Sequence, residues 1–192
     1  MNSLTDLGEE IVRVLWLALP VVVAAIVHIV MIKKKTLEVL KTPIDGGASF
    51  RGKRVFGDNK TWRGLIVYVV VSMLAIVPQH LWRIPSVEFS GLNYATWSGT
   101  LLLGFLLGLG FALGELPNSF LKRQLGIGAG VRGNVFFVIL DQVDSLIGCL
   151  LLICLIWVPP PITWVVVIGL CTLLHMAVNG VFVCVGLKKS IF

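Results

Sequence analysis

The stretch that decides the fold is Val14-Leu-Trp-Leu-Ala-Leu-Pro-Val-Val-Val-Ala-Ala-Ile-Val-His-Ile-Val-Met-Ile32, which carries no charge between Arg13 and Lys33. At about 1.5 Å per residue, a helix of this length crosses a hydrocarbon core of about 30 Å. The whole chain of 192 residues is 57% hydrophobic and 14% charged, with a mean hydropathy of +0.94. One soluble domain of this size cannot bury so much apolar surface, so the sequence predicts an integral membrane protein.

Further apolar segments follow along the chain. An uncharged run of 43 residues from Ser145 to Leu187 is too long for one crossing, and Pro159-Pro160-Pro161 divides it because a helix cannot continue there. We therefore predict one all-α membrane domain over residues 1–192. Its five spans lie at about 12–32, 65–82, 94–114, 135–158 and 162–185, and its cytoplasmic loops at 33–64 and 115–134.

The basic residues fall mostly on one side of these spans. The loops 33–64 and 115–134 and the C-terminal tail hold 14 of the 16 Lys and Arg residues, and only Arg13 and Arg83 lie on the other side. The positive-inside rule then places the N-terminus outside and the C-terminus in the cytoplasm. We expect a multi-pass protein of the cell (inner or plasma) membrane. Its four cysteines lie in predicted spans without metal-ligand spacing, and we interpret them as packing residues.

Three polar segments interrupt the apolar pattern, and the first is the basic, glycine-rich run from Arg51 to Gly64. Such a loop can bind lipid headgroups, fix the topology or hold phosphate through backbone N–H groups and cations. Asp45 and Asp58 argue against a loop that needs only positive charge. The candidate residues of this segment are Arg51, Arg54, Gly57, Asp58, Asn59, Lys60, Thr61 and Arg63.

The second polar segment follows the predicted third span. Glu115, Ser119 and Lys122 stand at i, i+4 and i+7, which is one face of a helix if the helix continues through Pro117. A carboxylate, a hydroxyl and an ammonium would then point the same way, with Arg123 beside them. The alternative is an ordinary cap at the membrane surface.

The third polar segment, Asp141-Gln-Val-Asp144, lies inside an apolar run. Two carboxylates at i and i+3 share a helix face, and at membrane depth each is costly unless it is paired, protonated or bound to a cation. Mg²⁺ suits such a site because it prefers oxygen ligands and often uses one or two carboxylates together with substrate phosphate. The alternative is a salt bridge to a Lys or Arg of another span.

All three segments lie on the predicted cytoplasmic side. Carboxylates, cations and a glycine-rich loop together indicate phosphoryl or nucleotidyl transfer at the membrane surface. A small transporter that uses the Asp141/Asp144 pair is the alternative from a non-enzyme class, although it has no need of a basic glycine-rich loop.

The motifs Phe56-Gly-Asp-Asn-Lys-Thr-Trp-Arg-Gly64, Ser119-Phe-Leu-Lys-Arg123 and Asp141-Gln-Val-Asp144 resemble those of the CDP-archaeol synthases, within the phosphatidate cytidylyltransferase superfamily. The resemblance extends from about Pro43 to the tail. It implies an enzyme that uses CTP and Mg²⁺ to convert a phosphorylated lipid alcohol, phosphatidate or its archaeal ether analogue, into a CDP-lipid with release of pyrophosphate. The dense Asp signature of the CDP-alcohol phosphotransferases, which also handle CDP-lipids, is absent.

The resemblance also implies roles for the candidate residues. Asp141 and Asp144, together with Glu115 where the family has Asp, are expected to bind the metal. Asp58 and Ser119 are expected to orient the reactants. The expected contacts to triphosphate or lipid phosphate come from Lys60, Arg63, Lys122 and Arg123, and further substrate contacts from Arg51, Arg54, Gly57, Asn59 and Thr61. We expect no nucleic-acid partner and leave a homodimer open.

Overall fold

The computed structural model describes residues 3–131 and 133–186, and within them five helical segments are long and apolar enough to cross a membrane. The predicted five spans are therefore confirmed in number. The elements are α1 (Ser3–Lys33), α2 (Trp62–Ala75), α3 (Val77–Trp82), α4 (Trp97–Gln124), α5 (Val135–Ile153), α6 (Pro161–Val166), η2 (Val167–Cys171) and α7 (Thr172–Cys184). Helices α2 and α3 form the second segment, and α6, the π-helical η2 and α7 form the fifth.

Helix α4 continues well past the predicted end of the third span at residue 114. It runs through Pro117 to Gln124 and ends before Gly126, whose φ of +80° is a left-handed conformation that favours glycine. The sequence placed the end too early because polar side chains were read as the start of a loop, although a helix can carry them at its membrane exit. The range 115–134 is thus helix in its first third, whereas α5 stops at Ile153, short of the predicted 158.

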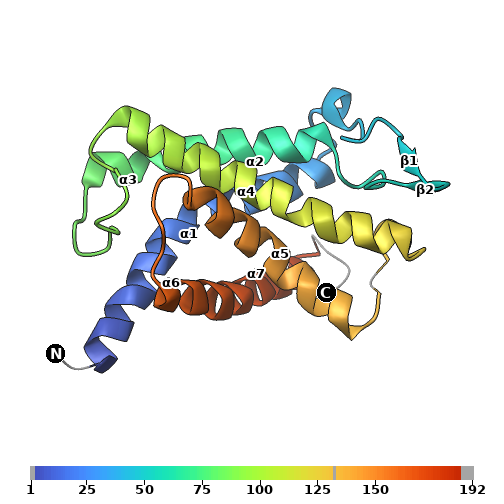
Figure 1. Cartoon of the computed structure of the whole chain (residues 1–192). Coiled ribbons are helices and arrows are strands. Elements are labelled where there is room, and N and C mark those ends of the chain that lie inside the picture. The colour runs from blue at the N-terminus through green and yellow to red at the C-terminus, as the bar shows by residue number, and fades with distance from the viewer. Residues whose placement is uncertain (1–2, 132, 187–192) are drawn as a thin grey trace.

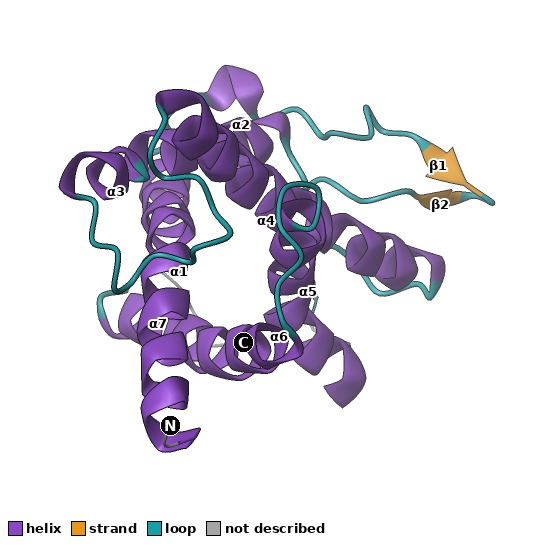
Figure 2. Ribbon diagram, turned by 60° about the vertical axis from the view of Figure 1, so that its left-hand side comes forward, coloured by secondary structure: helices purple, strands orange, loops and turns teal. Residues whose placement is uncertain are grey.

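The loop between α1 and α2 contains the only strands of the described residues, which the all-α prediction missed. A 3₁₀ turn, η1 (Glu38–Leu40), precedes β1 (Ser49–Phe50) and β2 (Lys53–Arg54), which pair antiparallel. Figure 2 shows this hairpin projecting away from the helices. Two-residue strands are too short to stand alone, so other contacts must hold the loop in place.

Glycines bring α4 into close contact with helices on two sides. A Cβ on Gly108 would lie 2.3 Å from the carbonyl oxygen of Tyr68 in α2. On the other side, a Cβ on Gly114 would lie 2.5 Å from the carbonyl oxygen of Asp144 in α5, and one on Gly148 would lie 2.2 Å from that of Gly110. Small residues four apart allow such approach between membrane helices, so α4 is fixed between α2 and α5.

The two ends of the bundle differ in chemistry. Figure 1 shows the N-terminus and the connection from α3 to α4 at one end, and the β1–β2 hairpin with the end of α4 and the start of α5 at the other. The second end holds the polar segments singled out in the sequence.

Candidate active site

The crossing of α4 and α5 joins the second and third polar segments. Asn118 of α4 lies between the two carboxylates of α5: its Nδ2 donates to Asp141 Oδ1 at 2.6 Å and to Asp144 Oδ2 at 2.8 Å. Asn118 and Asp144 are both buried, at 4% and 8% exposure. One amide nitrogen thus holds both carboxylates on the α4 side of α5.

Lys122 forms an ion pair with one of these carboxylates. Its Nζ lies 2.6 Å and 2.5 Å from the two oxygens of Asp141. The salt-bridge alternative therefore holds for Asp141, whose partner comes from another span. In the described residues Asp144 has neutral partners instead, namely Asn118 and the backbone N–H and hydroxyl of Ser145.

Lys60 connects the basic loop to this group. Its ammonium forms an ion pair with Glu115 of α4. Ser145 Oγ lies 3.3 Å from Glu115 Oε1 and 3.2 Å from Asp144 Oδ1, and so links the two carboxylates. All three polar segments consequently meet in one network, although Lys60 and Glu115 are separated by 55 residues.

Arg123 supplies a buried cation beside this network. Its side chain is packed against the loop at Gly57, where a Cβ would lie 3.5 Å from Arg123 Cδ and Nε. Only 7% of Arg123 is exposed, and among the described residues its Nε and Nη1 have no hydrogen-bond acceptor. A guanidinium buried without acceptors is unfavourable unless an anion completes it, so the arrangement favours a bound phosphate or similar group.

Comparisons with known proteins agree with this geometry. The profile of the CarS-like family, CDP-archaeol synthase, matches residues 7–192. The chain belongs to this family. The CDP-archaeol synthase of Methanoculleus marisnigri is 38% identical over 77% of this chain and 88% of its own, and that of Halobacterium salinarum is 30% identical over 77% and 82%.

A solved structure, described as an intramembrane enzyme for archaeal membrane lipids biosynthesis, superposes with a TM-score of 0.61. It is 29% identical and covers 85% of this chain and 90% of its own. The resemblance inferred from the motifs is confirmed, and the family match decides against the transporter alternative. The protein is a membrane enzyme, a CTP-dependent cytidylyltransferase.

In this CDP-archaeol synthase relative, Asp45 organises the basic loop. The side chain, 1% exposed, accepts hydrogen bonds from the N–H groups of Gly47, Phe56 and Gly57 at 2.9 to 3.1 Å and from Arg54 at 2.8 Å. Burial by itself would raise the pKa of Asp45, but these donors lower it to about 2. Asp45 thus holds both ends of the hairpin and sets the position of Gly57 against Arg123.

Several predicted substrate contacts of the family motif have other partners in the structure. Arg63 is buried and donates to Glu38 Oε1 at 2.7 Å, which lowers the pKa of Glu38. Thr61 caps α2 by accepting from the Gly64 N–H at 3.3 Å. Their phosphate contacts stay predictions.

Three further candidates of the basic loop lie on its outer surface. Asp58, 76% exposed, pairs with Arg54 at 2.6 Å, and Asn59 is exposed. The Arg51 guanidinium lies 5.2 Å from the centre of the Phe50 ring, at the turn of the hairpin. Ser119, by contrast, is buried on α4, one turn after Glu115.

The predicted metal ligands are only partly brought together. Within residues 3–131 and 133–186, no three or more His, Cys, Asp or Glu side chains form a cluster suited to a metal ion. Glu115 is occupied by Lys60. The buried Asn118 Oδ1, however, has no hydrogen-bond partner in the same ranges. With Asp141 and Asp144 it offers oxygen donors of the kind that Mg²⁺ prefers, so these residues fit a hard cation.

Sequence reasoning missed Asn118, Ser145 and Glu38 as members of the network. Asn118 and Ser145 carry a usable signal, because each is a polar side chain in an apolar helix next to an already identified charge. Glu38 has no such signal, since its partner Arg63 lies 25 residues away across an irregular loop.

Proposed function

We propose that this enzyme transfers the cytidylyl group of CTP to a phosphorylated lipid alcohol and releases pyrophosphate. An oxygen of the lipid phosphate attacks the α-phosphorus of CTP, and the bond from that phosphorus to the leaving pyrophosphate breaks. The observation that carries the proposal is the buried guanidinium of Arg123, which lacks an acceptor and lies against Gly57 beside the Asp141–Asn118–Asp144 group.

The residues around Arg123 divide the work. Lys60 and Lys122 are cations held at the site by Glu115 and Asp141, and with Arg123 they offset the negative charge of two phosphorylated reactants. Asn118, Asp141 and Asp144 would hold Mg²⁺, which when bound neutralises phosphate charge and orients the triphosphate. No side chain needs to act as a nucleophile.

The lipid is proposed from the relatives. Their name, CDP-archaeol synthase, favours the archaeal ether-linked lipid over phosphatidate. The distribution of basic residues supports an active site that faces the cytoplasm, with the N-terminus outside and the C-terminus inside. A homodimer stays a proposal, and the mass of the detergent-solubilised protein measures it.

The test is turnover by the purified protein. With CTP, Mg²⁺ and phosphorylated dialkylglycerol or phosphatidic acid, we expect stoichiometric CDP-lipid and pyrophosphate. Arg123→Gln should lower kcat/KM by about 100-fold, because a buried electrostatic contact to the reacting phosphates is lost. Lys34→Gln, which removes the same charge from an exposed position of the same face, should retain activity. Absence of product with every phospholipid would refute the proposed reaction.

A further inference from the structure

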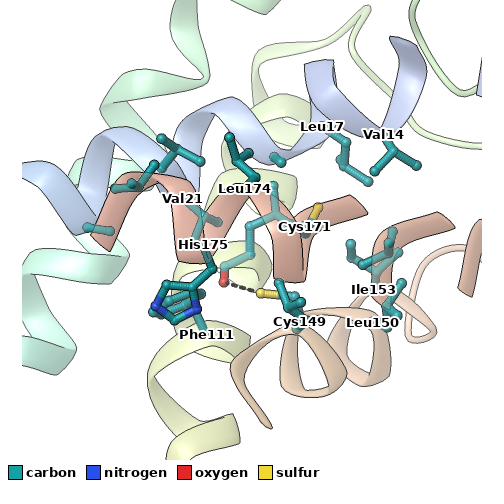
Figure 3. Close-up of a pocket in the computed structure, with 17 residues that line it drawn as sticks. Val14, Leu17, Val21, Phe111, Cys149, Leu150, Ile153, Cys171, Leu174 and His175 are labelled. Atoms are coloured by element: carbon teal, nitrogen blue, oxygen red, sulfur yellow. Dashed lines mark hydrogen bonds between the residues drawn. The ribbon is translucent and has the colours of Figure 1, made fainter. Parts of the chain in front are cut away.

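An apolar cavity lies inside the membrane-spanning part of the molecule. It has a volume of about 90 Å³, is partly open, and is bounded by α1, α4, α5, η2 and α7. Figure 3 shows Phe111 and His175 toward one end of it and Val14 and Ile153 toward the other. Its walls are almost entirely hydrocarbon and sulfur, and Cys149 Sγ donates to the Leu107 carbonyl at 3.3 Å.

One end of this cavity lies directly beneath the proposed active site. Phe111 stands one helical turn before Glu115 on α4, and Leu146 follows Ser145 on α5. Above Phe111 the Tyr68 ring packs at 4.6 Å between centroids. The polar network and the apolar cavity are therefore consecutive along the same two helices.

The cavity extends from there toward the opposite side of the membrane. Its lining on α1 runs from Val14 to Ala25, roughly 16 Å along a helix axis, or about half of a hydrocarbon core. Apolar cavities of this kind exclude water, and well-packed interiors seldom leave them empty. An elongated space with such walls and such a depth suits a hydrocarbon chain.

We propose that this cavity binds one hydrocarbon chain of the lipid substrate while the lipid phosphate lies at Arg123 and Lys122. The inference rests on the proposed function for the position of the phosphate. A phosphorylated glycerolipid has its polar and apolar parts joined within a few bonds, which matches the direct succession of network and cavity. The remaining chain would stay in the bilayer.

Filling the cavity tests the proposal. Ala18 lines it, whereas the neighbouring Leu19 is 46% exposed on the lipid-facing side of α1. Ala18→Phe should raise KM for the long-chain lipid about tenfold, in the range that a misfit of one or two carbons produces in an apolar pocket. KM for CTP and turnover of a short-chain phosphorylated glycerol ether should not change. Leu19→Phe is the matched control and should behave as the wild type.

A second measurement needs neither the variant nor turnover. A phosphorylated dialkylglycerol with a diazirine in mid-chain is irradiated with the wild-type protein, and the labelled peptides are mapped. Labelling of the cavity walls, such as Cys149 or Leu174, supports the proposal, and Ala18→Phe should suppress it. Labelling confined to lipid-facing residues, or equal effects of Ala18→Phe and Leu19→Phe on KM, would overturn it. Failure of the wild type to form CDP-lipid would instead refute the proposed function and leave the labelling result to decide on the chain site.

Discussion

The two halves of the active site are held in place by different physical means. The carboxylate half lies where α4 and α5 meet, and contact between backbones at Gly110, Gly114 and Gly148 sets its geometry. The basic loop lies outside the spans with almost no apolar packing, and Asp45 holds it through four donors. One half should therefore respond to changes in volume and the other to changes in charge and pH.

The largest effect should come from the carboxylate half. Asp144 is buried with neutral partners, so its charge is available to a cation or to the reactants rather than spent on an ion pair. Asp144→Asn should lower kcat by about 100-fold or more while the protein stays folded, because an electrostatic contact to the reacting groups is lost. CDP-lipid formation and the detergent-solubilised Tm measure the two effects.

The matched control is Glu88→Gln, which removes another buried carboxylate at the opposite end of the bundle. It should leave kcat within about twofold, since Glu88 is far from the reacting groups along the helices. Full activity of Asp144→Asn would remove Asp144 from the site.

The second prediction changes volume alone. A methyl group at Gly148 would meet the Gly110 carbonyl at 2.2 Å and Gly114 Cα at 2.6 Å, so Gly148→Ala must push α5 away from α4. Overpacking of this kind costs about 1–3 kcal/mol, and a shift near 1 Å at the site can reduce kcat by tenfold to about 100-fold. The measurements are Tm and kcat. Gly180→Ala, where no atom lies within 4 Å of the added methyl, should lower neither.

The sequence predicted the membrane half of the fold better than the loop. Five spans follow from long uncharged runs, and each polar segment was visible because it interrupts such a run. The end of α4 was wrong because polarity and helix ends are separate properties. The pairing of Lys60 with Glu115 joins residues 55 positions apart through an irregular loop, and no local pattern encodes such a contact.

The third prediction addresses the loop through charge. The pKa of Asp45 is lower in the folded protein, at about 2, than its ordinary value of 3.8. A depressed pKa stabilises the folded loop above pH ~4, and this stabilisation is lost as pH falls from about 4 toward 2. Hydrogen exchange at Phe56 and Gly57 should therefore accelerate across that window while protection of α4 at its contact with α5 persists.

Asp45→Asn should reproduce the loosened loop at neutral pH. Because the loop positions Gly57 and Lys60, we expect KM for CTP to rise roughly tenfold with a smaller change in kcat. Restoration of the KM by Asp45→Glu would identify the charge as the cause. Equal acid sensitivity of the loop and of the α4–α5 contact would contradict the division between the two halves.

The smallest effect is expected at Asp58, although the family resemblance gives it an orienting role. Its carboxylate is 76% exposed, and its partner Arg54 is held independently by Asp45 at 2.8 Å. Exposed ion pairs contribute little, so Asp58→Asn should change kcat/KM by less than about threefold. In the double variant with Asp45→Asn, however, Arg54 loses both carboxylate partners, and the combined loss should exceed the product of the single ones. A tenfold loss from Asp58→Asn alone would instead mean that the carboxylate acts on the reactants directly, and the division between a holding residue and a working one within this loop would have to be redrawn.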